Sequence, residues 1–361
     1  MNRFSMIWHN VQLKIKSSPF ICLVILLWML SPGQSARLSA GELTKVGTTS
    51  ANFLQLRVGP RAMALGGAFV GLADDVSALY WNPAGITNVP GLQMFYQNTH
   101  LYAGLKHQSL GITYALGSQN HLGLLVNYLD FGTMEQTTLE NPEGTNQTFD
   151  AASMAIGLTF ARQLTNRVAF GVTAKYIQER IWLEVARGYA IDIATLYTIR
   201  EIGLRIGMNL SNLGPDMGIG EAPHLKFYKR KPDDYPGSPQ PEAQLSTKTF
   251  PLPLAFSLGL SADLIGQNAL RVNEEHRLTA TTSITDGYDS PFRMNFGLEY
   301  AWHRTLALRA GYYLGYDTEN YSLGFGINVY KYAKINMQID YAWMNYGDLG
   351  SINSFGLQFQ F

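Results

Sequence analysis

Residues 293–302 read RMNFGLEYAW, with large apolar side chains at every second position and small, polar or charged ones between them. Residues 321–329, which read YSLGFGINV, and residues 335–343, which read INMQIDYAW, repeat the alternation. A side-chain period of two predicts a β-strand with one apolar face. An apolar face opposite Gly, Asn, Gln and Ser is typical of transmembrane barrels, in which lipid-facing and lumen-facing positions alternate.

Segments of this kind recur along the chain from residue 91 onward. Their starts lie near residues 91, 107, 120, 149, 166, 186, 202, 250, 276, 290, 305, 319, 334 and 351. This predicts about 14 strands, an even number as in bacterial barrels, and runs of about 9–12 residues match a tilted bilayer crossing. Aromatic residues such as Trp302 and Trp343 lie near strand ends, where interfacial girdles occur. We therefore expect an all-β fold, a transmembrane antiparallel β-barrel over residues 91–361, because a soluble β-sandwich would carry more charge outside.

The composition supports this interpretation and excludes other classes. The 361 residues are 46% hydrophobic and only 15% charged, which argues against a disordered chain or a coiled coil. Lys and Arg number 27, as do Asp and Glu, and a nucleic-acid binder would need clustered positive charge. The mean hydropathy is −0.04, too low for a helical membrane protein.

The N-terminal residues predict export. Arg3, Lys14 and Lys16 precede an apolar run over residues 20–30, which is followed by small residues. This order is typical of a secretory signal peptide, here residues 1–36 with cleavage somewhere between residues 33 and 40. The single cysteine, Cys22, would leave with it, so we expect no disulfide and no thiol chemistry in the mature chain. The expected location is the bacterial outer membrane, with its lipid as the barrel's surroundings.

Two longer connections interrupt the strands. Residues 213–253 contain eight of the 15 prolines, which cannot donate hydrogen bonds to a sheet. A shorter polar loop is expected over residues 133–149, on the same side of the barrel. Long loops of outer-membrane barrels are normally extracellular, so the Pro-rich loop is a candidate docking surface or a solvated loop without a specific role.

Residues 37–90 do not alternate and are rich in Gly, Ala and Asp. Small residues allow close backbone packing, so we expect this segment to fold into the lumen as a hatch. Asp74 or Asp75 could cap a short helix over residues 76–80, which Asn82 and Pro83 would end. We also expect Asn82 and Asp75 to satisfy backbone groups where the hatch meets the barrel.

Within this segment, residues 61–85 read RAMALGGAFVGLADDVSALYWNPAG. The GGAF, DD and WNPAG elements resemble the N-terminal signature of the PorV/PorQ family, which is similar in turn to FadL-type transporters. The resemblance implies a 14-stranded outer-membrane barrel with an N-terminal hatch. It marks as hatch residues Arg61, Gly66, Gly67, Phe69, Asp74, Asp75, Asn82, Pro83 and Gly85.

The last eight residues, SFGLQFQF, alternate strictly and end on an aromatic side chain. They resemble the C-terminal signal that the barrel-assembly machinery reads in bacterial outer-membrane proteins. The residues that would carry this signal are Phe355, Leu357, Phe359 and Phe361.

No catalytic motif accompanies these features. The sequence has no Walker loop, no HExxH and no GxSxG, and its histidines show no metal-ligand spacing. A Ser–His pair such as Ser109 with His121 can be chosen, but nothing in the spacing selects it. We therefore expect no enzyme activity, no cofactor and no metal site.

Two functions remain. The PorV/PorQ resemblance implies a non-catalytic partner in type IX-like secretion and cell-surface attachment, which engages a translocon or sortase and the C-terminal domains of cargo. The alternative is a FadL-type channel for hydrophobic small molecules or fatty acids. The motif favours the first function, and the sequence identifies neither cargo nor substrate.

Overall fold

The computed structural model describes residues 45–219, 247–267, 269, 271–303, 305–329 and 336–361. The predicted signal peptide, the first residues of the predicted hatch and most of the Pro-rich loop lie outside these ranges.

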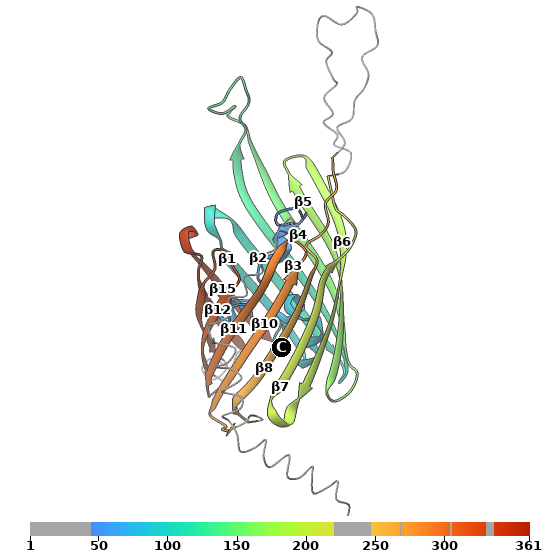
Figure 1. The fold of residues 1–361 in the computed structure, drawn as a ribbon, viewed down its shortest axis with the longest axis vertical. Helices are drawn as coiled ribbons and strands as arrows, with labels where there is room; N and C mark the ends of the chain where they lie inside the picture. Colours follow the sequence, from blue (N-terminus) through green and yellow to red (C-terminus); the bar gives the residue numbers. More distant parts are fainter. Residues whose placement is uncertain (1–44, 220–246, 268, 270, 304, 330–335) are drawn as a thin grey trace, which may run out of the picture. The chain divides into compact units, whose positions relative to one another are not determined.

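Fourteen long antiparallel strands of the described chain form a closed barrel (Figure 1), as the alternation predicts. They are β1 (Leu92–His100), β2 (Lys106–Leu116), β3 (Asn120–Glu135), β4 (Thr148–Gln163), β5 (Val168–Ile181), β6 (Glu184–Ile199), β7 (Leu204–Leu213), β8 (Ala255–Gly266), β10 (His276–Gly287), β11 (Ser290–Trp302), β12 (Leu306–Leu314), β13 (Tyr321–Asn328), β14 (Met337–Asn345) and β15 (Ser351–Gln360). Each long strand pairs with the next, and pairings of β15 with β1 and of β8 with β10 complete the ring. A two-residue strand, β9 (Arg271–Val272), lies parallel to β8.

Antiparallel order places the connections alternately at two ends of the barrel. The β3–β4 and β7–β8 connections share one end, here called the long-loop end, as predicted. The other end is the short-turn end. The β3–β4 loop is shorter than the predicted 133–149, because strand pairing continues to Glu135 and resumes at Thr148. Short 3-10 turns lie in three connections, η3 (Tyr102–Gly104), η4 (Arg200–Ile202) and η5 (Gly347–Leu349).

The outer face of the barrel is apolar. Along β12, Leu308 and Tyr312 are exposed whereas the intervening Arg309 and the following Tyr313 are buried. On β15, Phe355 is exposed and its neighbours in the alternation, Ser354 and Gly356, are buried. The exposed apolar positions form the face that lipid would cover, since the barrel alternation directs the other residues inward.

Strands β3–β6 form a taller wall than the rest of the barrel. They have 14–16 residues, whereas β12–β15 have 8–10, close to the length of a bilayer crossing. The outward aromatic residues Tyr176 and Tyr189 contact each other with ring centroids 5.6 Å apart. Beyond them towards the long-loop end, the outward side chains become charged, as in the Asp150–Arg180 ion pair. We call the part of β3–β6 that extends from Tyr176 and Tyr189 towards the long-loop end the raised wall.

Residues 45–90, here called the lumenal segment, lie inside the ring of strands (Figure 1). The segment contains η1 (Asn52–Gln55), α3 (Pro60–Ala64), α4 (Ala78–Trp81) and η2 (Pro83–Asn88). Five of its large apolar side chains are at most 1% exposed: Leu65, Phe69, Leu72, Leu79 and Ile86. Among the described residues, no helix is both long and apolar enough to cross a membrane.

Candidate functional site: the lumenal segment and its cavities

Glycines on the inner face of the barrel allow the lumenal segment to touch the wall backbone to backbone. A Cβ atom on Gly311 would collide with the backbone of Leu65 and Gly66, and one on Gly207 would collide with the carbonyl of Val70. A Cβ on Gly297 would lie 2.6 Å from the carbonyl oxygen of Leu65. The same backbone crowding occurs at Gly171 and Gly259, whereas a Cβ on Gly123, Gly324 or Gly356 would meet side chains of the segment. We call residues 58–86, which make these contacts, the wall-fitted part of the lumenal segment.

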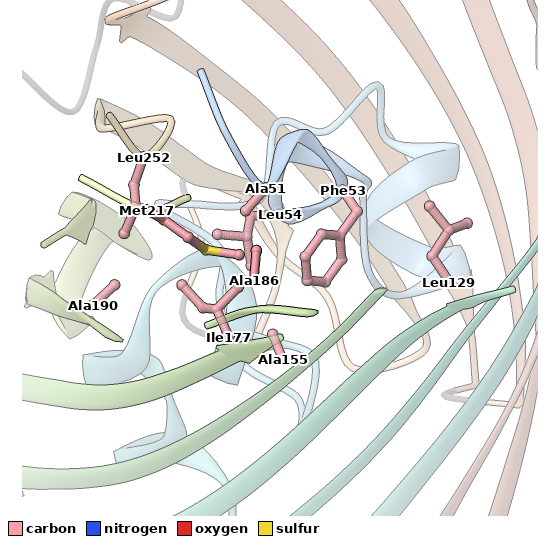
Figure 2. Packing of buried hydrophobic residues seen from close by; sticks show 10 residues of the cluster. All are labelled: Ala51, Phe53, Leu54, Leu129, Ala155, Ile177, Ala186, Ala190, Met217 and Leu252. Atoms are coloured by element: carbon pink, nitrogen blue, oxygen red, sulfur yellow. The ribbon is translucent and has the colours of Figure 1, made fainter. Parts of the chain in front are cut away.

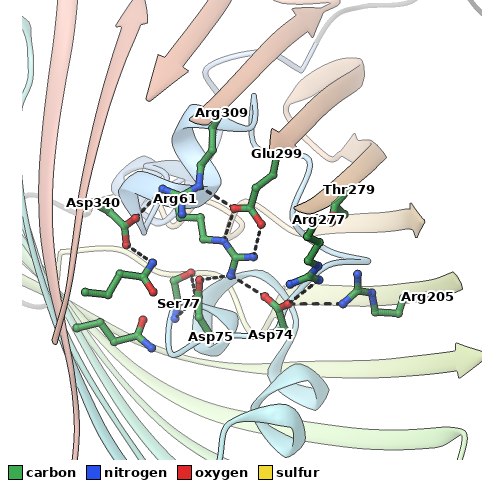
Figure 3. A network of polar contacts seen from close by, with 12 residues as sticks. Arg61, Asp74, Asp75, Ser77, Arg205, Arg277, Thr279, Glu299, Arg309 and Asp340 are labelled. Carbon is green, nitrogen blue, oxygen red and sulfur yellow. Dashed lines mark hydrogen bonds and ion pairs between the residues drawn. The ribbon is translucent and has the colours of Figure 1, made fainter. Parts of the chain in front are cut away.

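A buried ion network joins the wall-fitted part to the barrel, with Arg61 at its centre (Figure 3). Arg61 binds Glu299 of β11 through Nε and Nη2, both at 2.8 Å. Its Nη1 lies 2.6 Å from Asp74 and 3.0 Å from Asp75. Because a guanidinium cannot lose its proton under ordinary conditions, Arg61 supplies a permanent positive charge to these three carboxylates.

The network continues along the wall in two directions. On one side, Asp74 lies 3.5 Å from both Arg205 and Arg277, and Asp263 joins the same two arginines at 2.9 and 3.3 Å. On the other side, Arg309 lies 2.7 Å from Glu299 and 2.6 Å from Asp340. Each charge therefore has an opposite charge within reach, which a buried ionic cluster requires.

The two adjacent aspartates of the lumenal segment have different roles. Burial raises the pKa of both, but for Asp74 the guanidinium groups of Arg61, Arg277 and Arg205 outweigh burial and hold its pKa below the usual value. For Asp75 burial prevails over Arg61, and its pKa is raised. Asp75 accepts hydrogen bonds from the backbone N–H and the hydroxyl of Ser77. Asp75 thus holds the turn that precedes α4. Asp74 forms ion pairs instead and does not cap the helix, which was one of the two alternatives expected from the sequence.

Asn82 connects the lumenal segment to β6. The side chain is fully buried, and its Nδ2 donates to the carbonyls of Val70 at 2.9 Å and Thr195 at 3.1 Å. Its Oδ1 accepts from Ala84 N–H as η2 begins. Asn82 therefore satisfies a barrel backbone group, as expected, whereas the backbone partner of Asp75 belongs to the lumenal segment itself.

The remaining residues of the motif act through their size or backbone conformation. Gly66 and Gly67 have φ angles of 69° and 77°, which glycine adopts without strain. A Cβ on Gly85 would collide with Ala73, and Pro83 begins η2. The guanidinium of Arg61 lies over the fully buried ring of Phe69, 5.4 Å from its centroid.

Residues 45–56, the outer part of the lumenal segment, are held differently. Asp289, in the β10–β11 turn, accepts hydrogen bonds from Thr49 and from Gln55, the latter at 3.1 Å. Ser50 N–H donates to Pro251 O at 2.9 Å, and Ala51 N–H donates to Glu179 at 3.2 Å. These contacts place the outer part at the long-loop end.

Arg57 marks the junction between the two parts. Its guanidinium lies over the rings of Tyr313 and Tyr316, 4.6 and 5.0 Å from their centroids. It also pairs with Glu319 at 3.2 Å and donates to the hydroxyl of Tyr346 at 3.0 Å. These contacts tie residue 57 to the loops at the long-loop end.

Cavities lie on both sides of the wall-fitted part. One, of about 510 Å³, is lined by Arg61, Asp75 and Glu299 together with Glu274 and Thr305 of the short-turn end. Glutamines add to its lining: Gln93, Gln267, Gln338, Gln358 and Gln360. The other, of about 100 Å³, faces the long-loop end and is lined by residues including Arg57, Trp81, Lys175 and Asp289. The lumenal segment thus separates two polar spaces.

An apolar cluster lies at the long-loop end, on the inner face of the raised wall (Figure 2). We call it the outer apolar cluster. It consists of Ala51, Phe53, Leu54, Leu129, Ala155, Ile177, Ala186, Ala190, Met217 and Leu252, all of them buried. The first three belong to the outer part of the lumenal segment, and the others come from β3–β6 and the ends of the Pro-rich loop.

Several site residues could not be selected from the sequence. Arg205, Asp263 and Arg277 join the ion network, but the only sequence signal is that each occupies an inward position of a strand. Glu299, Arg309 and Asp340 are also inward, and each is a rare charge at a strand position that otherwise carries small or polar residues. The alternation of a strand shows whether a charged side chain faces the lumen or the lipid, but it does not show which residue pairs with it. Arg61 and Glu299, for example, are 238 residues apart in the sequence.

The Ser–His pair considered from the sequence is not found among the described residues. Ser109 Oγ is buried without a hydrogen-bond partner among the described residues, so the Ser109–His121 pair is not formed. Within the described ranges, no three His, Cys, Asp or Glu side chains are grouped to hold a metal ion.

No protein-family model matches the sequence, and no curated protein matches it either. Solved structures do match the fold. The CymD monoaromatic hydrocarbon channel is 11% identical, and the match covers 84% of this chain and 97% of that one with a TM-score of 0.55. The toluene transporter TbuX of Ralstonia pickettii is 11% identical, with 84% and 98% covered and a TM-score of 0.53.

At 11% identity this likeness shows the fold alone, that of a closed antiparallel barrel of 14 long strands among the described residues. The barrel fold that the sequence resemblance implies is thereby supported. The PorV/PorQ resemblance itself rests on residues 61–85 alone.

Proposed function

We propose that this protein is a non-catalytic channel of the bacterial outer membrane that admits small apolar molecules, with the lumenal segment as its hatch. The single observation that carries the proposal is a FadL-like barrel whose lumen is closed by its own chain between two cavities. The two solved structures described above are named as a monoaromatic hydrocarbon channel and a toluene transporter. We propose molecules of that size and polarity as the substrates.

The closure of the lumen by the lumenal segment argues against a general pore for polar solutes. Such a pore needs a continuous aqueous path, but here the lumenal segment lies across the lumen with Leu65, Phe69 and Leu72 buried in an apolar cluster. Small apolar molecules do not need a continuous aqueous path, because they enter apolar regions favourably. They require only a transient displacement of the hatch. The outer apolar cluster gives them a first contact at the long-loop end, which we take to be extracellular.

The proposal is tested by uptake. Cells that carry the full chain in the outer membrane should take up labelled toluene faster than cells without it, whereas uptake of a sugar of similar mass should be unchanged. Asp289→Ala removes the acceptor that holds Thr49 and Gln55, so it should raise toluene uptake further. Asp286→Ala is the matched control, because Asp286 is exposed in the same hairpin.

Two results would contradict the channel. One is folded barrel in the outer membrane without any gain in toluene uptake. The other is an equal gain for toluene and the sugar, which would indicate an open pore.

The secretion role implied by the PorV/PorQ resemblance is a second candidate, and the raised wall favours it. A wall that continues beyond the lipid-facing band, with charges such as Asp150 and Arg180 on its outer face, offers a surface to a translocon or cargo domain. The candidate is tested by pull-down from outer membranes with the full chain and with residues 220–246 replaced by a short linker. Loss of a specific partner supports it, and unchanged partners would count against the loop as the docking surface.

A further inference from the structure

The larger of the two cavities lies at the short-turn end of the barrel, and we call it the short-turn cavity. Its volume of about 510 Å³ lies within the range of about 300–1,000 Å³ that is typical of small-molecule sites. Arg61, Asp74 and Asp75 of the lumenal segment form its inner end (Figure 3), and the exposed Glu274 lies at its outer end. Short turns of outer-membrane barrels face the periplasm, so a ligand would reach this cavity from that side.

One wall of the short-turn cavity consists of four glutamines on adjacent strands, and we call it the glutamine wall. They are Gln338 of β14, Gln358 and Gln360 of β15, and Gln93 of β1. Gln358 donates a hydrogen bond to Gln93 at 2.7 Å, and Gln338 donates to Asp340 at 2.8 Å. These bonds fix the carboxamides, yet the side-chain oxygens of Gln338 and Gln358 accept no hydrogen bond from the residues that the structure describes. The glutamine wall therefore presents both donors and acceptors to the cavity.

The rest of the lining carries more negative than positive charge. Six carboxylates line the cavity, against the three guanidinium groups of Arg61, Arg277 and Arg309. All hydrogen bonds that Asp263 accepts in the described part of the chain end on its Oδ1, so its Oδ2 is free for a ligand. Glu274 is exposed and makes no ion pair within the described ranges. The surplus of negative charge attracts a cation and repels an anion.

The glutamine wall and the free carboxylate oxygens together fit a peptide with a basic side chain. A backbone amide has one N–H and one carbonyl oxygen, which a carboxamide can bind with its own oxygen and N–H groups. A Lys ammonium has three donors and no acceptor, so it can pair with the free oxygens of Asp263 and Glu274. No three carboxylate or imidazole groups of the described residues are placed to hold a metal ion, which favours an organic cation.

We infer that the short-turn cavity is a binding site for a short basic peptide segment that reaches it from the periplasm. The basic side chain pairs with Asp263 and Glu274, and the peptide backbone binds the glutamine wall. Because Arg61 and Asp75 form the inner end of the cavity, the bound peptide contacts the lumenal segment from the side opposite to the long loops. The site does not depend on the proposed channel function.

The test uses the purified full chain in detergent and two acetylated, amidated tripeptides, Gly-Lys-Gly and Gly-Glu-Gly. Isothermal titration calorimetry measures the affinity of each at low and at high salt. Glu274→Gln removes a charge at the outer end of the cavity, and its matched control is Glu143→Gln, an exposed glutamate at the long-loop end. Gln358→Met removes a carboxamide of the glutamine wall at nearly constant length, and its control is the exposed Gln147→Met of the β3–β4 loop. Gln360→Met serves if Gln358→Met does not fold.

The Lys peptide should bind, and the Glu peptide should bind at least about tenfold more weakly because repulsion replaces attraction. Glu274→Gln should weaken binding of the Lys peptide about threefold to fivefold, as expected for the loss of one exposed ion pair, and high salt should weaken binding to the parent. Gln358→Met should also weaken binding, and both control variants should bind as the parent does. Saturating Lys peptide should slow hydrogen exchange in residues 74–77 and leave residues 45–56 unchanged, because a ligand stabilises the segment that it contacts.

Three results would overturn the site. They are a failure of the Lys peptide to bind, equal affinities for the two peptides, and equal losses in Glu274→Gln and Glu143→Gln. Slower exchange in residues 45–56 alone would place the peptide at the long-loop end and would overturn the site as well. Peptide binding without toluene uptake would contradict the channel and keep the site, and toluene uptake without peptide binding would do the reverse.

Discussion

The two parts of the lumenal segment show two ways in which one chain can close a barrel. Residues 58–86 touch the wall through inward glycines and carry the centre of a buried ion network. Residues 45–56 touch it through one apolar cluster and a few hydrogen bonds to side chains and loop carbonyls. Backbone contact against a glycine leaves no room for adjustment, whereas side chains can rotate away. We therefore expect any opening of the lumenal segment to begin at the outer part.

The largest expected effect comes from breaking the ion network. Arg61→Leu leaves Asp74, Asp75 and Glu299 without their shared cation in a buried site, at a cost of about 3–5 kcal/mol of unfolding free energy. The temperature at which the folded barrel is lost on unboiled gels should fall strongly. Arg167→Leu is the control, because its pair with Glu201 is exposed and is worth about 0–1 kcal/mol. Equal effects of the two variants would mean that the network does not hold the segment.

The fit of the glycines is tested by adding one methyl group. Gly311→Ala places a carbon against the backbone of Leu65 and Gly66, which should destabilise the barrel by about 1–3 kcal/mol. Gly157→Ala is the matched change on an inward glycine of β4, where the nearest atom is the methyl group of Thr173. Urea unfolding curves measure both. If Gly157→Ala proves as harmful as Gly311→Ala, the contact with the lumenal segment is not the cause.

A loss of comparable size is expected at the link to β6. Asn82→Ala leaves the buried carbonyls of Val70 and Thr195 without the amide that binds them, which costs about 1–3 kcal/mol. Asn88→Ala, at an exposed position of η2, should leave the heat resistance unchanged. The measurement is the heat resistance of the folded barrel on gels. If the Asn82→Ala variant is as resistant as the parent, Asn82 does not stabilise the contact with β6.

The smallest effect is expected in the outer part. Thr49→Val removes one hydrogen bond to Asp289, worth about 1 kcal/mol, and should leave global unfolding almost unchanged. Hydrogen exchange should quicken in residues 45–56 only, because their opening does not need the wall-fitted part to move. Thr48→Val, at an exposed hydroxyl, is the control. Faster exchange throughout residues 58–86 would show that the two parts open together.

Much of the barrel was predictable because strand alternation is a local property. The fourteen predicted starts lie within a few residues of the observed strands, with the largest difference at β8, where the chain approaches through Pro251 and Pro253 before pairing begins at Ala255. Asn82 was also predictable, since an Asn before a Pro at a helix start has few other roles. The ion-pair partners of Asp74 were not predictable, because Arg205 and Arg277 come close to Asp74 only when β7 and β10 take their places in the barrel.

The sequence by itself determined which side chains face lipid and which face the lumen, because a period of two is set by the backbone of each strand. It also marked a glycine- and alanine-rich segment that could not be a strand of this barrel. Only the tertiary structure decided where that segment touches the wall, which charges meet at Arg61 and which ring fills the outer apolar cluster. These contacts join residues as far apart as Ala64 and Ser322, which are 258 positions apart, and Arg57 and Tyr346, which are 289 apart, so their geometry depends on the closure of the whole barrel.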